Sequence, residues 1–318
     1  MEQTFMKEKK ILPLVLSMSL PMMLSMLVNS LYNIVDSYFV AQISEQAMTA
    51  LSLVYPLQLL ETAIAVGFGI GMNAAAAYYL GAKEQQRADD IVTSGLILSL
   101  LHGVILMAAA LLFAPAFVSL FTENEKILAE GVKYSNLVFI FAVPNVIAIT
   151  FEKIFQAEGR MKVSMLSMLC GCVANIILDP LLIFGIGIFP KMGIEGAAIA
   201  TGIGQVIPLI VYLFIFIKHP VSLHFHWHEK VFQKRLMGQM YGVGIPATLN
   251  LALPSFMITA LNGILAVYSA SYVLVLGIYY KLQTFIYLSA NGIVQGIRPI
   301  ISYNYGAGER GRVKRIFI

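Results

Sequence analysis

The stretch that decides the fold is ILPLVLSMSLPMMLSMLVNSLYNIVDSYFV, residues 11–40. It is longer than the roughly 20 apolar residues that an α-helix needs to cross a bilayer, so we expect a membrane-spanning helix. Its single charge, Asp36, lies inside the span, where a charged group costs about 3 kcal/mol on insertion scales and usually faces a cavity or a partner. Asp36 is therefore the first candidate for a transport site. The alternative is a hydrogen bond to a neighbouring helix.

Helical spacing gives this span a polar face. Asn29, Tyr32, Asn33 and Asp36 are three or four residues apart, which stacks them on one side of a helix. Pro21 lies earlier in the same span, and because proline lacks an N–H we expect the helix to bend there. Tyr32 and Asn33 are accordingly grouped with Asp36 as candidate site residues.

The composition of the whole chain predicts a polytopic, all-α membrane protein. Hydrophobic residues make up 58% of the chain, charged residues 12%, and the mean hydropathy is +0.80, far outside the range of soluble domains. Apolar runs long enough to span a bilayer lie at 11–40, 47–80, 91–118, 131–157, 163–186, 193–217, 237–266 and 270–305. We expect eight membrane-spanning helices.

Lys and Arg indicate the orientation. They concentrate before the first span and after the even-numbered spans, at 7–10, 83–87, 153–162, 218–235 and 310–315. By the positive-inside rule, the N-terminus and these connections are expected to be cytoplasmic.

An internal repeat relates the two parts of the chain. Pro21 and Pro246 are 225 residues apart, and the same offset matches Gly67 with Gly292 and Gly81 with Gly306. Six spans separate the two copies, so both begin in the same orientation, which predicts a parallel repeat with the substrate path between its halves. The units are a six-helix bundle at 1–218, a cytoplasmic linker at 219–236, and at 237–318 the first two helices and the start of a third of a second bundle. A complete repeat would hold twelve helices, so we expect the chain to be truncated in its second half.

Asp179 is the second candidate at membrane depth. Asn175 lies one turn before it on the same helix face, and Pro180 follows it directly. Proline disfavours α-geometry in the preceding residue, which predicts free backbone carbonyls near Asp179, although a helix-end turn is the alternative. Two acids with amide and hydroxyl groups suit the binding of a proton or of a sodium ion, and the sequence leaves both open.

Three further charged positions need an explanation. Glu152 is close in sequence to Lys153 and Arg160, which favours an interfacial ion pair. Lys281 and Arg298 are the deep cations of the last span, and they either pair with acids or reach toward the interface.

The linker, HPVSLHFHWHEKVFQKRL at 219–236, carries four histidines, of which His224, His226 and His228 are closely spaced. His224 and His228 would share one helix face, which is a metal-binding spacing. No third type of ligand and no cysteine accompanies them in the linker, so we favour a solvated basic segment, with room for an amphipathic helix on the bilayer surface.

Sequence motifs give no support for an enzyme. The chain has no Walker motif, no HExxH, no GxSxG and no metal–thiolate spacing. We expect no enzymatic activity, no cofactor and no nucleic-acid partner, and transport not driven by ATP hydrolysis in this chain.

Several motifs resemble those of the multidrug and toxic compound extrusion (MATE) family. They are LYNIVDSYFV at 31–40, YLGAK at 79–83, ANIILDPLLIF at 174–184, GIEGAAIAT at 193–201 and IRPIISYNYGAG at 297–308. The likeness covers essentially the whole chain and is closest to bacterial drug-exporting members.

The resemblance implies a two-lobe exporter in the bacterial cytoplasmic (inner) membrane, monomeric when full length. It would export cationic drugs in antiport with protons or sodium ions, by alternating access. The family's cation site falls on Asp36, Asn175 and Asp179, where sodium is a possible ligand, and a sixth-helix threonine falls on Thr201. The proline whose bending is linked to protonation falls on Pro21.

Two other functions compete. A flippase for lipid-linked oligosaccharides has a related architecture, but its cavity would present several cations to a pyrophosphate. A membrane scaffold that transports nothing is the third class.

Overall fold

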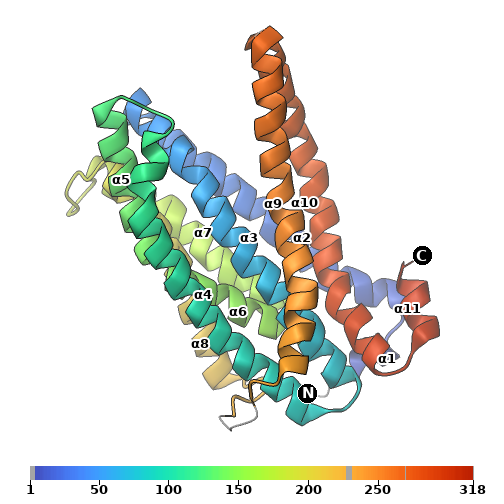
Figure 1. Ribbon diagram of the computed structural model, residues 1–318. Helices are drawn as coiled ribbons and strands as arrows, with labels where there is room; N and C mark the ends of the chain where they lie inside the picture. The colour runs from blue at the N-terminus through green and yellow to red at the C-terminus, as the bar shows by residue number, and fades with distance from the viewer. Residues whose placement is uncertain (1–3, 227–230, 269, 318) are drawn as a thin grey trace.

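Every regular element that the computed structural model describes is an α-helix (Figure 1). The structure describes residues 4–226, 231–268 and 270–317, and the side chains between 254 and 289 only in part. The helices are α1 (Phe5–Glu8), α2 (Ile11–Ala41), α3 (Glu45–Gly81), α4 (Gln85–Ser119), α5 (Glu125–Ile140), α6 (Ala142–Ala157), α7 (Met161–Phe184), α8 (Ile194–Lys218), α9 (Lys234–Tyr268), α10 (Ala270–Gly306) and α11 (Arg310–Phe317).

The predicted all-α membrane class is confirmed. Among the described residues, α2, α3, α4, α7 and α8 are each long and apolar enough to cross a membrane, and the bent pair α5–α6 would make a sixth span. The expected seventh and eighth runs form the long helices α9 and α10. The total of eight spans, and the division into two units and a linker, stay predictions.

The run at 131–157 is not one straight helix as the sequence suggested. α5 and α6 meet at Phe141 with a bend of 46°. Pro144 lies in the first turn of α6 and cannot donate to the Ile140 carbonyl, which interrupts the helical hydrogen bonds at this point.

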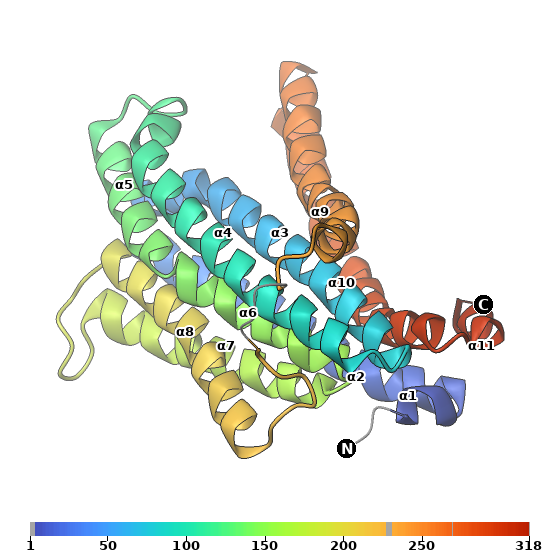
Figure 2. The same ribbon diagram turned by 60° about the horizontal axis from the view of Figure 1, so that its bottom comes forward.

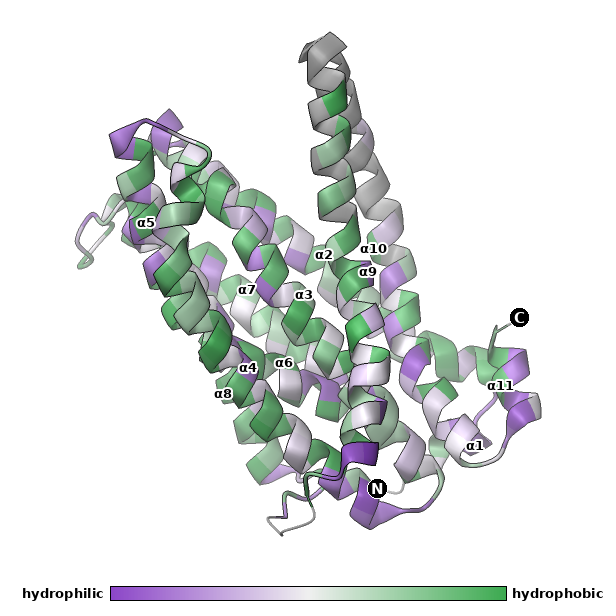
Figure 3. Cartoon of the chain, viewed as in Figure 1, coloured by the Kyte–Doolittle hydropathy of each residue, from purple (hydrophilic) through white to green (hydrophobic). Residues whose placement is uncertain are grey.

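Hydrophobic side chains cover the outside of the bundle. Figure 3 shows hydrophobic residues along α4 and α8, where the side chains of Leu112, Phe113, Phe214 and Ile217 are more than 60% exposed. Hydrophilic residues gather at the helix ends. This is the surface that a lipid bilayer stabilises, because its hydrocarbon removes the exposed apolar area from water.

Helices α9 and α10 stand side by side and join the first bundle through α3 and α2 (Figure 1). α10 packs on α2, and α9 packs on α3. The repeat offset of 225 residues maps α3 at 45–81 onto α10 at 270–306 and α2 onto α9. The two interfaces are therefore copies of each other, as a parallel repeat requires.

Glycines make these two interfaces close. A Cβ added to Gly67 or Gly71 would collide with the backbone of α9, at Thr248 and Met240 respectively. Such contacts permit short distances between helix axes. The four-residue spacing of Gly67 and Gly71 therefore gives α3 a smooth face on which α9 packs closely.

The same contacts recur on α10. A Cβ on Gly292 would collide with Met23, and one on Gly296 with Ser19, both on α2. The glycine pair of the second repeat thus packs on α2 as the first pair packs on α9.

The segment that joins α8 to α9 is docked on the bundle, which corrects the expectation of a solvated linker. It crosses the end of the bundle past α6 and α4 (Figure 2). Glu158 Oε1 accepts hydrogen bonds from the Ser222 and Leu223 backbone N–H groups, at 2.5 and 3.1 Å, and Leu223 is buried. An extended chain has unpaired N–H groups, and carboxylates of the bundle satisfy them here. Residues 219–226 form no helix, and His228 lies outside the described residues.

Candidate functional site

Two carboxylates from different helices meet inside the first bundle. Asp36 of α2 and Asp179 of α7 are 8% and 0% exposed, and α2 packs directly on α7. The two groups are close enough to interact electrostatically, and Tyr32, one turn before Asp36, interacts with both. The structure thus brings together the two acids that the sequence placed 143 residues apart.

Amide and hydroxyl oxygens complete this centre. Asn175 Nδ2 donates to Asp179 Oδ1 at 3.2 Å, and both Asn175 and Thr201 of α8 are buried. Four buried oxygens carry no hydrogen bond among the described residues: Asp36 Oδ1, Asn175 Oδ1, Asp179 Oδ2 and Thr201 Oγ1. Buried polar atoms are normally paired. A set made only of oxygens fits a proton or a hard cation such as sodium, and does not fit a soft metal.

Two residues of the centre escaped sequence analysis. Tyr134 of α5 is 1% exposed, its hydroxyl lies beside Thr201 and Gln58, and it interacts electrostatically with Asp36. Nothing in the local sequence marks Tyr134, because only the fold brings α5 to this point. Gln58 had one signal, since the repeat offset matches it with Gln283.

Asn33 and Pro21 also lie on α2, but their hydrogen bonds stay within that helix. Asn33 Nδ2 donates to the Asn29 carbonyl at 2.8 Å, so its amide is used within its own helix. Pro21 is inside α2, and Ser25 Oγ donates to its carbonyl at 2.8 Å. Because Pro21 has no N–H, the carbonyl one turn earlier, at Ser17, lacks its helical donor, which makes α2 easier to bend here.

Asp179 lies inside a continuous helix, so both the predicted departure from α-geometry at this residue and the alternative of a helix-end turn are wrong. α7 continues through Pro180 to Phe184. Because Pro180 has no N–H, the hydrogen bond that it would donate one turn earlier, to the Ile176 carbonyl, is missing. An unpaired carbonyl is therefore present, but not at Asp179 itself.

Glu152 forms its predicted ion pair in an unexpected place. Lys153 Nζ lies 2.9 Å from Glu152 Oε1, and the two residues are 1% and 7% exposed, so the pair is buried and not interfacial. Gln156 bonds to both side chains. Arg160 takes no part and donates instead to the His219 carbonyl. Helix spacing on α6 explains the position of Gln156, which lies four residues after Glu152 and three after Lys153.

The two cations predicted deep in the last span stay undecided. Arg298 is half-buried on α10 and forms no ion pair among the described residues. The Lys281 side chain lies outside the described residues.

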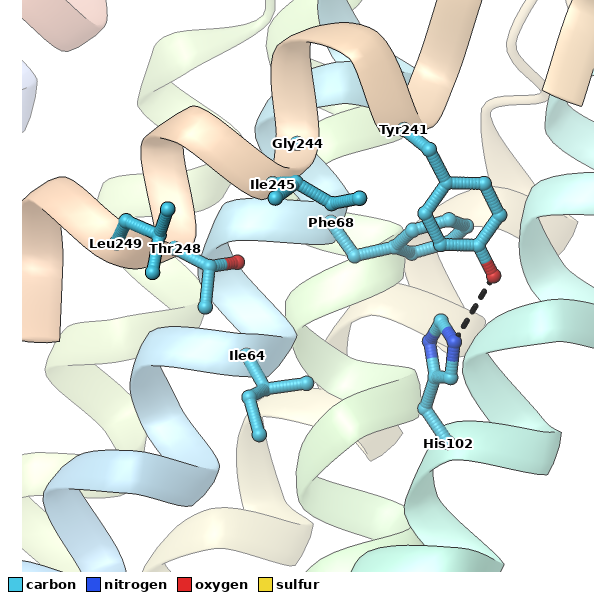
Figure 4. Close-up of a pocket in the computed structure, with 8 residues that line it drawn as sticks. All are labelled: Ile64, Phe68, His102, Tyr241, Gly244, Ile245, Thr248 and Leu249. Atoms are coloured by element: carbon cyan, nitrogen blue, oxygen red, sulfur yellow. Dashed lines mark hydrogen bonds between the residues drawn. The ribbon is translucent and has the colours of Figure 1, made fainter. Parts of the chain in front are cut away.

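A second feature, an apolar pocket, opens between the first bundle and α9 (Figure 4). Its volume is about 230 Å³, and it is lined by α3, α4 and α9. Tyr241 and His102 are hydrogen-bonded at 3.0 Å across it. The Phe68 ring lies 4.7 Å from the His102 ring and 5.2 Å from the Tyr241 ring, measured between centroids. The remaining lining residues are Ile64, Gly244, Ile245, Thr248 and Leu249.

Comparison with known sequences gives a family and named relatives. The sequence profile of the MatE family matches residues 21–181. The chain is 28% identical over 317 residues to the "Multidrug export protein MepA" of Staphylococcus aureus strain MRSA252, covering 99% of this chain and 69% of the relative.

Solved structures share the fold. One, described as the outward-facing conformation of a multidrug resistance MATE family transporter, has a TM-score of 0.90 at 22% identity, over 99% of this chain and 69% of that one. A MOP superfamily transporter from Pyrococcus furiosus has a TM-score of 0.91 at 22% identity, over 100% of this chain and 70% of that one. Its description states that a reversed polarity of the binding pocket suggests a different function. The polarity of the site, and not the fold, therefore has to carry any argument about substrates.

Proposed function

The chain belongs to the MatE family, and from that premise we propose that it exports drugs, in particular organic cations, in exchange for protons or sodium ions. The relative in Staphylococcus aureus is named for multidrug export. The mechanism would be alternating access, in which the two units expose the same sites first to one side of the membrane and then to the other.

The pair Asp36–Asp179 is the observation that carries this proposal. Two like charges held together away from water repel each other. A proton or a sodium ion relieves the repulsion, and the unpaired oxygens of Asn175 and Thr201 are available to complete its coordination. The centre therefore has two states, with and without the cation, that differ in the attraction between α2 and α7.

Helix α2 supplies the connection from this centre to the second unit. It carries Asp36 near its end, and its other half packs on α10. Pro21 lies between Ser19 and Met23, the two positions that Gly296 and Gly292 approach. A bend of α2 at Pro21 would therefore shift α10 directly, since the glycine contacts leave no space between the helices.

The aromatic pocket of Figure 4 supports an organic substrate. Ring faces attract cations and flat organic molecules, and Phe68 and Tyr241 come from different units of the repeat. A molecule bound here would contact both units at once, as a substrate must if its binding is to favour one arrangement of them.

Efflux of ethidium from cells that lack their own exporters tests the proposal. The complete gene product should speed efflux, and Asp36→Asn and Asp179→Asn should each abolish the gain at unchanged protein levels. Glu61→Gln is the matched control, because Glu61 is also buried at membrane depth but pairs with Asn145 at 2.9 Å. It should retain export.

Proteoliposomes distinguish the coupling ions. An imposed pH gradient should drive ethidium movement if the ion is a proton, and an imposed sodium gradient should drive it if the ion is sodium. Movement that needs neither gradient, or full activity of both aspartate variants, would overturn the proposal.

The flippase for lipid-linked oligosaccharides remains the alternative, but no structural observation favours it. The described residues of the centre are acids, amides and hydroxyls, whereas a pyrophosphate would require cations. Accumulation of a lipid-linked precursor after gene loss would favour the flippase over the drug exporter.

A further inference from the structure

The docked segment between α8 and α9 brings two histidines to a buried carboxylate. His224 and His226 belong to this segment, and Asp89 lies in the second turn of α4. One potential ligand atom from each of the three residues lies within 4.8 Å of the other two. From this geometry we propose that Asp89, His224 and His226 bind a divalent transition-metal ion of the Zn²⁺ class, with water as the fourth ligand.

The chain conformation explains why both imidazoles are on the same side. Residues 224 and 226 are two positions apart in a stretch that is neither helix nor turn, and in a non-helical chain alternate side chains tend to point the same way. Their ring centroids are 5.9 Å apart, and the ring planes differ by 33°. A helical linker, as considered from the sequence, would pair His224 with His228 and would lack a third ligand. In the structure, α4 supplies that ligand.

The carboxylate is held in place by its own hydrogen bonds. Asp89 is 5% exposed, and its Oδ1 accepts from Gln85 Nε2 and from the His224 backbone N–H, each at 2.9 Å. The His226 N–H donates to Thr93 Oγ1 at 3.2 Å, which fixes the backbone on the other side. Among the described residues, no hydrogen bond of Asp89 ends on Oδ2. Outer hydrogen bonds of this kind orient metal ligands and strengthen binding.

The distances between the three potential ligand atoms are short enough for one metal ion to bind all three after a small movement. In a tetrahedral zinc site the ligand atoms are roughly 3.3 Å apart, because Zn–N and Zn–O bonds are 2.0–2.2 Å long. The three atoms must therefore approach one another by about 1.5 Å at most from their 4.8 Å limit. Both histidine side chains are exposed, so a change of rotamer supplies this movement without disturbing the core.

The donor set selects the class of metal. Two imidazoles and one carboxylate suit Zn²⁺, Co²⁺, Ni²⁺ or Cu²⁺, whereas Mg²⁺ and Ca²⁺ prefer oxygen ligands only. The site is thus chemically different from the all-oxygen centre at Asp36 and Asp179. A bound ion would clamp the segment that leads into α9 onto the first bundle, and so restrain the start of the second unit.

The chain carries a built-in probe for this site. Trp227 is the single tryptophan and directly follows His226 in the sequence. The complete protein, purified with a histidine-free tag and stripped with EDTA, should lose tryptophan fluorescence as one equivalent of Co²⁺ is added. Visible absorption of tetrahedral Co²⁺ should rise in step, and Zn²⁺ should reverse both signals, while Mg²⁺ should change neither.

Histidine variants test the assignment. Because both side chains are exposed, His224→Ala and His226→Ala should fold normally, and each should weaken Co²⁺ binding at least about tenfold. The double variant should lose stoichiometric binding. His219→Ala, which removes an exposed histidine of the same segment outside the cluster, is the matched control and should bind like the parent. Binding that survives in the double variant, or no stoichiometric binding by the parent protein, would overturn the proposal.

Discussion

Gly81, the last residue of α3, lies directly against the backbone carbonyl of Tyr303 on α10, so that a Cβ at this position would overlap the carbonyl oxygen. The reciprocal contact also exists, because a Cβ on Gly306 would overlap the carbonyl of Tyr78. The offset of 225 residues exchanges the two contacts. The ends of α3 and α10 therefore cross at the axis of the repeat, and each helix uses a glycine to let the other approach.

Gly81→Ala should destabilise the protein by about 1–3 kcal/mol, since the added methyl forces two backbones apart. Gly306→Ala should cost a similar amount, because its contact is the symmetry copy. Thermal unfolding in detergent measures both effects. Gly242→Ala on α9 is the matched control, because a Cβ there meets nothing within 4 Å and alanine favours helix. Equal unfolding temperatures for Gly81→Ala and Gly242→Ala would contradict the crossing.

Hydropathy and the internal repeat were enough to predict the membrane-spanning helices and the pairs of glycines that recur in the two units. The spans follow from apolar length, and the glycine pairs follow from their recurrence at one offset. The bend between α5 and α6 was missed because the hydropathy of 131–157 is continuous, although Pro144 was a local signal. The docking of the linker could not be predicted, since Glu158 and Asp89 reach it only through tertiary packing.

The candidate site was predictable only in part, for the same reason. Asp36 and Asp179 stand out because acids are rare at membrane depth, whereas Tyr134 is an ordinary aromatic residue until α5 packs beside α3 and α8. Burial of the Glu152–Lys153 pair could not be predicted either. Neighbouring opposite charges suggest an exposed pair, and only the packing of other helices on α6, among them α3 and α8, encloses it.

Removal of one carboxylate at the centre should stabilise the protein in the absence of its cation. Asp36→Asn leaves Asp179 without a like charge beside it, so we expect a gain of about 1 kcal/mol, the size of one modest buried polar interaction. Thermal unfolding in ion-free buffer measures it. If added sodium or low pH raises the unfolding temperature of the parent protein, it should raise that of Asp36→Asn by less. Glu61→Gln, which has no second carboxylate among its described neighbours, should give no such gain. A less stable Asp36→Asn would contradict the proposed repulsion.

Lys153→Met should destabilise the first bundle by about 3–5 kcal/mol, because it leaves Glu152 buried without a counter-charge. The double variant Glu152→Gln with Lys153→Met should recover much of this loss, since no charge then remains. Lys133→Met is the matched control, because Lys133 pairs with Glu195 at 3.1 Å while both side chains are at least 40% exposed. It should change stability by less than about 0.5 kcal/mol. A double variant no more stable than Lys153→Met would show that packing, not charge, dominates.

The contact between α1 and the end of α10 should depend on pH through Lys7 and Glu309, which are 2.8 Å apart. Lys7 lowers the pKa of the Glu309 carboxyl, and Glu309 raises the pKa of the Lys7 ammonium. The contribution of Glu309 is therefore present above the pKa of an unfolded glutamate, about 4.3, and is lost as the pH falls through the lower folded value. The contribution of Lys7 is present below about 10.4 and is lost as the pH rises through its higher folded value.

Hydrogen exchange of the Lys7, Glu8 and Lys9 amides, which donate to the Thr4 and Phe5 carbonyls, should be slow between about pH 5 and 10 and faster outside this range, after correction for intrinsic rates. Glu309→Gln should remove the acid-side change. It should not release α1 completely, because Asn304 Nδ2 donates to the Met6 carbonyl at 3.0 Å and Arg312 donates to it at 3.3 Å. Arg312→Ala should therefore speed exchange at every pH. If Glu309→Gln instead kept the full acid response, another carboxyl would have to control the contact.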